Sequence, residues 1–183
     1  LGFTKALDAN GISIQGKDCL ILGAGGVARA VAYAATQSEP ASITIANRTL
    51  EKADSLASWI NTVNSKIKAT SITLEEADTV TKVQIVINCT SLGMSPHSDT
   101  SPFTSHDLGQ YHLLVDTVYS PPVTRFLSDG SSAGARTVGG LDMFIYQGLA
   151  SLDLWFAKPI SQQVDIRSVS KYLKEKLMEA SLS

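Results

Sequence analysis

DCLILGAGGVARA, residues 18–30, is the stretch that decides the fold of this chain. It begins with a short apolar run typical of a buried strand and leads into the alanine- and valine-rich residues 25–38, which predict a helix. Gly23, Gly25 and Ala28 follow the pattern G-x-G-x-x-A. In a turn from strand to helix, such glycines let the backbone approach a pyrophosphate that the helix N-terminus faces. We therefore expect a bound dinucleotide here and not a tight turn without a ligand.

Strands and helices alternate along the rest of the chain. Apolar runs predict strands at residues 42–46, 66–70, 83–88, 113–116 and 135–138, and helices are expected at 50–63, 123–129, 141–156 and 165–180. Strands that are apolar throughout and alternate with helices are typical of a parallel sheet covered on both faces. The fold class is therefore α/β, a doubly wound parallel sheet of six strands with flanking N- and C-terminal helices. The long polar segment 90–110 follows a strand's carboxyl end, where such sheets bind ligands.

Composition argues against several classes of partner. With 15 basic and 17 acidic residues the net charge is only −2, so we expect neither nucleic acid nor a membrane surface. Cys19 and Cys89 lie in apolar runs without a Cys/His cluster, and His97, His106 and His112 lack metal-ligand spacing, so no metal is expected. The N-terminus lacks the layout of a signal peptide, and no apolar run is long enough to span a bilayer. These features favour a reduced, cytoplasmic setting.

The end of the second expected strand indicates which dinucleotide binds. NAD-binding sheets place an acidic residue there, which holds the ribose 2′-hydroxyl. This chain has Asn47, Arg48 and Thr49 at that point, with Lys52 one turn later. A guanidinium pairs well with a 2′-phosphate, and a cation near a helix N-terminus is disfavoured unless an anion joins it. We therefore predict NADP; the alternative is that Arg48 is simply solvated.

Five motifs make the chain resemble the NADP-binding domain of shikimate dehydrogenases, including the related quinate/shikimate enzymes. They are GAGGVARA (23–30), NRTLEKA (47–53), NCTSLGM (88–94), DTVYSPPVTRFL (116–127) and GGLDMFIYQG (139–148). Because they occur in order over nearly the whole chain, they are far more specific than the glycine turn alone.

The resemblance implies a set of residues that contact the cofactor. They are Gly23, Ala24, Gly25, Gly26 and Val27 at the pyrophosphate; Asn47, Arg48, Thr49 and Lys52 at the 2′-phosphate; and Thr90, Ser91, Thr117, Gly140 and Met143 along the rest of NADP. The family often has Arg where Lys52 stands, so the charge is kept while bidentate geometry is lost. Tyr119 and Gln147 are implied to reach the substrate. The alternatives are that Met143 fills the core, Tyr119 anchors a loop beside Pro121 and Gln147 is an exposed helix residue.

The reaction implied by the resemblance is reversible hydride transfer between NADPH and C3 of 3-dehydroshikimate, which gives shikimate for aromatic amino acid biosynthesis. Proton transfer in the family uses a Lys and an Asp of a separate N-terminal domain, and neither has a counterpart here. The family's Asp lies in an N-T-D-x-x-G stretch, and this chain begins two residues after it, at LGFTKAL. We therefore expect residues 1–16 to be a linking helix from a missing substrate domain, 17–157 the NADP-binding domain, and 158–183 a C-terminal helix at the domain junction.

Two expectations follow from a missing partner domain. The loss of the partner should expose the faces that carry Phe3, Leu7, Leu173 and Leu177, so that the isolated chain self-associates or buries these faces in some other way. No residue of this chain is expected to be catalytic.

Three possible substitutes for the missing proton-transfer pair are weak. Lys5 and Asp8, one helical turn apart, resemble an ordinary surface ion pair. Asp116 ends a strand on the cofactor side but has no evident partner. Tyr172 and Lys176 match the Tyr/Lys pair of short-chain dehydrogenases, yet they fall in the last helix, beyond the sheet.

The sequence thus predicts the cofactor half of an NADP-dependent shikimate dehydrogenase, which binds NADP(H) with little or no turnover. Two alternatives stay open: the cofactor domain of a quinate/shikimate dehydrogenase, and a stand-alone NADPH-binding regulatory module.

Overall fold

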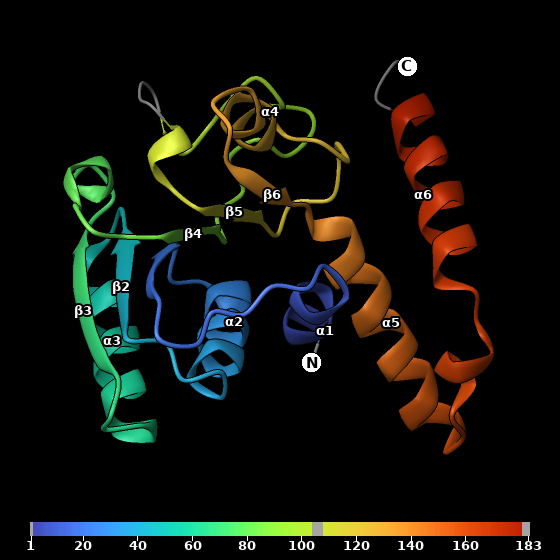
Figure 1. The fold of residues 1–183 in the computed structure, drawn as a ribbon, viewed down its shortest axis with the longest axis horizontal. Coiled ribbons are helices and arrows are strands. Elements are labelled where there is room, and N and C mark those ends of the chain that lie inside the picture. The colour runs from blue at the N-terminus through green and yellow to red at the C-terminus, as the bar shows by residue number, and fades with distance from the viewer. Residues whose placement is uncertain (1, 104–107, 181–183) are drawn as a thin grey trace.

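Six strands form one parallel sheet in the order β3-β2-β1-β4-β5-β6 (Figure 1). The structure is a computed structural model that describes residues 2–103 and 108–180. The strands are β1 (Asp18–Leu22), β2 (Ser42–Asn47), β3 (Lys68–Thr73), β4 (Ile85–Asn88), β5 (Leu113–Asp116) and β6 (Arg136–Val138). Every pair of neighbours is parallel, which confirms the predicted doubly wound sheet. The strand order reverses between β1 and β4, and ligands of such sheets bind outside the carboxyl ends of the strands at that point.

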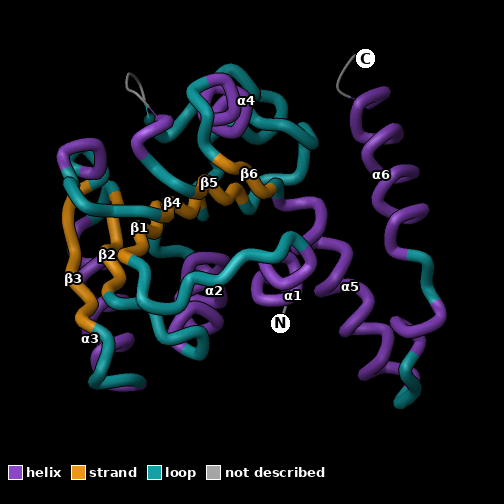
Figure 2. Tube along the Cα trace, in the orientation of Figure 1, coloured by secondary structure: helices purple, strands orange, loops and turns teal. Residues whose placement is uncertain are grey.

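Helices cover the two faces of the sheet unequally (Figures 1 and 2). One face packs against α1 (Gly2–Ala9), α2 (Gly26–Thr36) and α3 (Leu50–Val63). The other face packs against α4 (Arg125–Ser132) and the short 3-10 turns η1 (Ala77–Thr79) and η2 (Leu108–Gln110). Strand residues alternate between these two layers, because successive side chains of a strand point to opposite faces: Cys19 and Ile21 face the first, Leu20 and Leu22 the second.

Several predicted boundaries are wrong by two or three residues, and two of them have a clear physical reason. Strand β3 runs to Thr73 and not to residue 70, since its polar end pairs with the end of β2, with Asn47 opposite Thr73. Helix α4 begins at Arg125 because Thr124 caps it, its Oγ1 accepting a hydrogen bond from the Leu127 amide at 3.4 Å.

The last helices lie beyond the β6 edge of the sheet (Figure 1). Helix α5 (Gly140–Phe156) is followed by the 3-10 turn η3 (Ile160–Gln163) and by α6 (Ile166–Ala180), which packs along α5. Leu173 and Leu177 of α6 are half-buried in this contact. In the described part of the chain, no helix combines the length and the apolar character needed to cross a membrane.

Helix α1 is part of the main core, so the expectation that its apolar face is exposed is wrong. Phe3 and Leu7 are each 3% exposed and belong to the cluster between the sheet and its first helical layer. Gly2 lies so close to α5 that a Cβ there would be 2.6 Å from the Met143 carbonyl oxygen. Burial against α5 thus replaces the exposure that a missing partner domain suggested.

Candidate functional site

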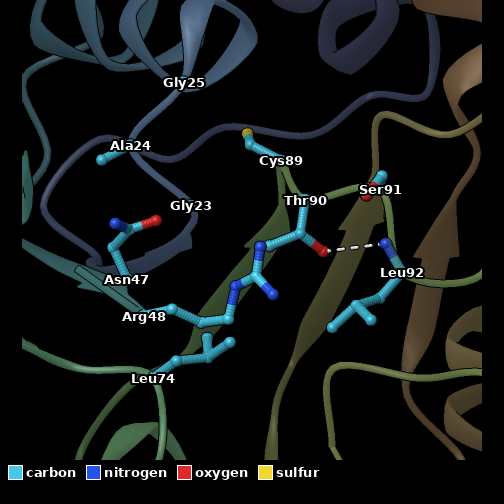
Figure 3. Close-up of a pocket in the computed structure, with 10 residues that line it drawn as sticks. All are labelled: Gly23, Ala24, Gly25, Asn47, Arg48, Leu74, Cys89, Thr90, Ser91 and Leu92. Carbon is cyan, nitrogen blue, oxygen red and sulfur yellow. Dashed lines mark hydrogen bonds between the residues drawn. The ribbon is translucent and has the colours of Figure 1, made fainter.

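A cleft of about 230 Å³ opens at the carboxyl ends of β1, β2 and β4 (Figure 3). This is the place where the strand order reverses. The cleft is lined by Gly23, Ala24, Gly25, Asn47, Arg48, Leu74, Cys89, Thr90, Ser91 and Leu92. Four segments that are distant in sequence therefore meet in it: the glycine turn, the end of the second strand, the segment after the third strand and the loop after the fourth.

The first glycine of the turn is required by the fold itself. Gly23 has φ +102°, which side-chain-bearing residues rarely adopt. A Cβ at this position would also lie 3.0 Å from the carbonyl oxygen of Cys89. The turn after β1 can therefore pass close to β4 only with glycine at position 23.

At position 25, in contrast, the fold itself does not require a glycine. Its backbone is extended, with φ −81° and ψ −168°, and a Cβ there would meet no atom within 4 Å. Any residue could adopt this conformation, so neither backbone strain nor packing explains a glycine. The open space on the cleft side of Gly25 is therefore room for a ligand.

The N-terminus of α2 faces this space without a side-chain cap. Gly25 is the N-cap residue and offers no side-chain hydrogen-bond acceptor to the first turn. The unpaired N–H groups of a helix N-terminus, with the positive end of its dipole, bind phosphate and other anions. Gly26 and Val27 begin the helix and are exposed beside the cleft. The turn thus has the shape and the donor groups to hold an anion such as a pyrophosphate.

Arg48 supplies a cation next to this anion-binding turn. Its side chain is exposed and extends from the end of β2 toward the loop after β4 (Figure 3). Among the described residues it forms no ion pair, whereas Arg125 and Lys176 do. Asn47 shapes the bend, its Nδ2 donating to the Thr49 carbonyl oxygen at 2.8 Å. Arg48 is therefore available to an anionic group of a ligand.

Thr49 and Lys52 lie at the edge of the cleft, not in its lining. Thr49 is the N-cap residue of α3, and its hydroxyl accepts no hydrogen bond from that helix. Both side chains are exposed on the first turn of α3, beside Arg48. This arrangement groups two cations and an uncapped helix start.

The wall after β4 is held from inside by a buried polar network. Asp116 is 1% exposed and accepts hydrogen bonds from Asn88 Nδ2 at 3.0 Å, the Val118 amide at 2.9 Å and Thr124 Oγ1 at 2.6 Å. Burial raises the pKa of Asp116 to about 6, although these hydrogen bonds lower it. Asp116 thus has its partners within the protein and is not available as an acid for a substrate.

The predicted nicotinamide-side residues Thr117 and Gly140 are in direct contact. A Cβ on Gly140 would lie 2.4 Å from the Thr117 carbonyl oxygen, so only glycine permits this approach of α5 to the end of β5. Next to them, the exposed Tyr119 stacks on Phe144, with ring centroids 4.5 Å apart. Phe144 was not predicted as a site residue. It stands in the motif GGLDMFIYQG, but nothing in that motif shows that its ring stacks on Tyr119.

Met143 and Gln147 lie elsewhere than in the cofactor cleft. Both line a second cleft of about 270 Å³ between α1, α2 and α5, which also includes Gly2, Phe3 and Ala30. Met143 is partly buried against the main core, and Gln147 is exposed. These positions agree with the alternatives that Met143 fills the core and that Gln147 is an exposed helix residue.

The substitutes for a proton-transfer pair lie away from the cleft. Lys5 is close enough to Asp153, near the far end of α5, to lower the pKa of that carboxyl, after the larger effect of the Ser161 hydrogen bonds. Lys176 pairs with Glu179 at 2.7 Å on α6.

The histidines form no metal site in the described part of the chain. No group of potential metal ligands occurs in residues 2–103 and 108–180. His97 is exposed in the loop after β4, His112 lines a cleft at the amino ends of the strands, and His106 lies outside the described residues.

Three cleft residues were not predicted as site residues: Leu74, Cys89 and Leu92. Leu92 and Cys89 stand within the motif NCTSLGM, so that motif was the signal that could have found them. Leu74 comes from the segment between β3 and η1, and nothing in its sequence pattern points to a ligand. Burial raises the pKa of the Cys89 thiol, so it stays protonated at neutral pH.

The chain is similar to known proteins over most of its length. The family profile described as shikimate/quinate 5-dehydrogenase matches residues 5–101. The shikimate dehydrogenase (NADP(+)) of Caldicellulosiruptor saccharolyticus is 36% identical over 158 residues, which cover 85% of this chain and 55% of the relative. The shikimate dehydrogenase (NADP(+)) of Methanosarcina acetivorans is 35% identical over 187 residues, and the match covers 98% of this chain and 61% of the relative.

A solved structure has the same arrangement of elements. Shikimate 5-dehydrogenase from Thermus thermophilus, in complex with NADP(H) and shikimate, matches with a TM-score of 0.69 and 32% identity. The match covers 84% of this chain and 54% of that one. The chain spans about half the length of the curated relatives it matches.

Proposed function

The chain belongs to the shikimate/quinate 5-dehydrogenase family, and we propose that it forms the part of a shikimate dehydrogenase that binds NADP(H). One observation carries this proposal: open space at Gly25, before an uncapped helix N-terminus, lies beside Arg48, which forms no ion pair with any residue that the structure describes. The two features fit the two anionic groups of NADP, the pyrophosphate at α2 and the 2′-phosphate at Arg48. NAD lacks the second group.

The chain's own residues would bind and orient the cofactor. When bound, NADPH supplies the hydride that reduces a carbonyl carbon. The amides at the start of α2 would hold the pyrophosphate, and Arg48 with Thr49 and Lys52 would hold the 2′-phosphate. Thr117 and Gly140 lie farther along the same edge of the sheet, where the nicotinamide would extend. The stacked ring of Tyr119 is the side chain that would lie toward a substrate beyond it.

We further propose that proton transfer and most substrate binding depend on residues outside these 183. Residues 17–157 would bind NADP(H), while 1–16 and 158–183 would flank a junction with a substrate domain. The packing of α1 and α6 against the same helix, α5, supports this division. Within the described part, the candidate acid Asp116 is buried and hydrogen-bonded, so it cannot serve a substrate carbonyl.

The test is an assay of binding and turnover on the 183-residue polypeptide. We expect saturable NADPH binding, seen as a change in NADPH fluorescence, together with shikimate oxidation at least about 10²-fold slower than that of a full-length relative, because general acid–base catalysis contributes about 10²–10⁴-fold. The enzyme of Caldicellulosiruptor saccharolyticus, measured in parallel, is the control. Turnover comparable to that enzyme would contradict the division of labour.

The remaining alternatives are decided by simple comparisons. Quinate in place of shikimate, tested in a protein that includes the remaining half, separates the two substrates. A coding sequence that continues upstream through a lysine and an N-T-D stretch supports a dehydrogenase, whereas its absence supports a stand-alone NADPH-binding module.

A further inference from the structure

Asn88 is a buried residue that is hydrogen-bonded to Thr90 and Leu92 in the loop that forms the cleft wall. It ends β4 and is 0% exposed, so it cannot reach a ligand itself. Its Oδ1 accepts hydrogen bonds from the Thr90 amide at 3.0 Å and from Thr90 Oγ1 at 2.7 Å. Its Nδ2 donates to the Leu92 carbonyl oxygen at 3.3 Å and to Asp116 Oδ1 at 3.0 Å.

The direction of these hydrogen bonds follows from the carboxylate of Asp116. An ionised carboxylate only accepts hydrogen bonds, so the group of Asn88 that faces it must be the NH₂. The amide oxygen of Asn88 then faces Thr90 and accepts a hydrogen bond from the Thr90 hydroxyl. The oxygen of that hydroxyl is left to accept from the Leu92 amide, at 3.1 Å (Figure 3). One orientation of one amide therefore sets the conformation of residues 88–92.

This conformation determines what the wall presents to the cleft. Because the Thr90 hydroxyl proton points inward to Asn88, it is not available to donate to a phosphate. The Thr90 methyl group Cγ2 lies on the side of the glycine turn, 3.4 Å from where a Gly23 Cβ would be. Where the wall faces the glycine turn, it thus presents the Thr90 methyl group and the Cys89 carbonyl, which allows a close approach to the turn.

We infer that Asn88 is a positioning residue for the dinucleotide: its amide, oriented by Asp116, fixes the Thr90 loop at the distance from the glycine turn that the cofactor requires. This inference rests on the proposed function. The hydrogen-bond network also reaches the segment that carries Tyr119, because the Asp116 carboxylate accepts hydrogen bonds from the Val118 amide before it and from the Thr124 hydroxyl after it. Asp116 therefore links the loop at the cofactor to the loop at the expected substrate side.

The first test removes the amide. In Asn88→Ala, Thr90 loses both of its hydrogen bonds to Asn88 Oδ1, and we expect the dissociation constant for NADPH to rise at least about tenfold, the equivalent of one hydrogen bond. The matched control is Thr36→Val at the opposite end of α2, which removes a buried hydroxyl bonded to the Tyr33 carbonyl oxygen at 2.7 Å. Thr36→Val should lower the free energy of unfolding about as much as Asn88→Ala does, but it should change NADPH affinity less than about twofold.

The second test replaces the amide by an acid of the same shape. In Asn88→Asp, two carboxyl groups meet at the place of the 3.0 Å contact, and like charges raise the pKa of one of them. The other titratable group recorded beside Asp116 is the Cys89 thiol, which burial keeps neutral. A proton shared by the two acids restores a donor toward Asp116 and an acceptor toward Thr90. At pH 9 Asn88→Asp should therefore bind NADPH about tenfold or more weakly than the unaltered chain. At pH 6.5 the two dissociation constants for NADPH should differ by less than about threefold.

The outcomes are distinguishable. If the unaltered chain does not bind NADPH, the proposed function is wrong and this inference falls with it. If the unaltered chain binds NADPH but Asn88→Ala binds it equally well, or the Asn88→Asp ratio is the same at every pH, only the positioning role is refuted. Should Asn88→Ala fail to fold, the pH series of Asn88→Asp decides alone.

Discussion

Replacing Gly25 with alanine should abolish most NADPH affinity while leaving the fold intact. The backbone at this position is one that any residue adopts, and an added Cβ meets no atom within 4 Å. The methyl group would instead occupy the space in front of the uncapped start of α2, where the pyrophosphate should lie. Fold and function therefore make opposite demands on this residue, and the substitution separates them.

The magnitudes follow from these contacts. Alanine is less favourable than glycine at a helix N-cap, but it also restricts the unfolded chain, so the net change in the free energy of unfolding should stay within about 1 kcal/mol. For a chain of this size that is a shift in Tm of no more than about 4 °C. Displacing the pyrophosphate by a methyl group removes at least one hydrogen bond to a charged group, worth about 1.5–3 kcal/mol, which is a loss of about 10- to 100-fold in affinity.

The assay is fluorescence titration with NADPH beside thermal unfolding, on Gly25→Ala and on Gly148→Ala. Gly148 also has nothing within 4 Å of a built Cβ, but it lies on α5, outside the cleft. Its replacement should raise stability by about 0.5–1 kcal/mol, as alanine does in a helix, with unchanged affinity. If Gly25→Ala binds NADPH as tightly as the unaltered chain, the space at this turn is not the pyrophosphate site.

Three further predictions concern the framework of the site. Gly140→Ala places a Cβ 2.4 Å from the Thr117 carbonyl oxygen, so α5 must shift, and overpacking of this kind should lower stability by about 1–3 kcal/mol, visible as a lower Tm. Phe3→Ala should lower the free energy of unfolding by about 3–5 kcal/mol because Phe3 is buried in the core, measured by urea denaturation. Asp116→Asn should remove a pH dependence of stability: the folded-state pKa of about 6 exceeds the ordinary value of 3.8, so this carboxyl favours folding below pH 4, and that contribution, about 3 kcal/mol, is lost as the pH rises through 6.

The predictions for Phe3 and Asp116 each have an internal control. Leu154→Ala, at a side chain that is 80% exposed, should change the free energy of unfolding by less than about 0.5 kcal/mol. If Phe3→Ala causes as small a change, α1 is not packed in the core. For Asp116 the quantity to compare is the stability difference between variant and unaltered chain at pH 4.5 and pH 7. Hydrogen bonds with Ser161 and Ser168 lower the pKa of Asp153 and Asp165, which act in the opposite direction in both chains. A difference that does not change with pH would refute the effect assigned to Asp116.

The sheet could be predicted from the sequence because its signals are local. The central strands carry continuous apolar runs, as in CLIL at residues 19–22 and IVI at residues 85–87, and the glycine turn carries its own spacing between β1 and α2. Errors occurred where a mostly polar stretch belongs to a strand: Ser71 and Thr73 flank a single apolar residue, Ile72, yet all three pair with β2. There the pairing partner, and not the local pattern, decides where the strand ends.

Much of the site could be predicted only through motifs, and its inner layer could not be predicted at all. Arg48 followed from the end of β2, where a charge near a helix start stands out. Asn88 and Asp116 are 28 positions apart, and nothing in either local pattern shows that they face each other in the core. The stacking of Tyr119 on Phe144 is hidden for the same reason. Such contacts depend on which strands become neighbours, which is a property of the folded sheet.

The most direct test of the account is the preference for NADPH over NADH in the intact chain and in Arg48→Ala. A charged hydrogen bond to the 2′-phosphate should make NADPH bind about 10- to 100-fold more tightly than NADH, and the substitution should abolish that preference while leaving NADH affinity unchanged. Equal affinities of the intact chain for the two cofactors would contradict the assignment of this cleft to NADP.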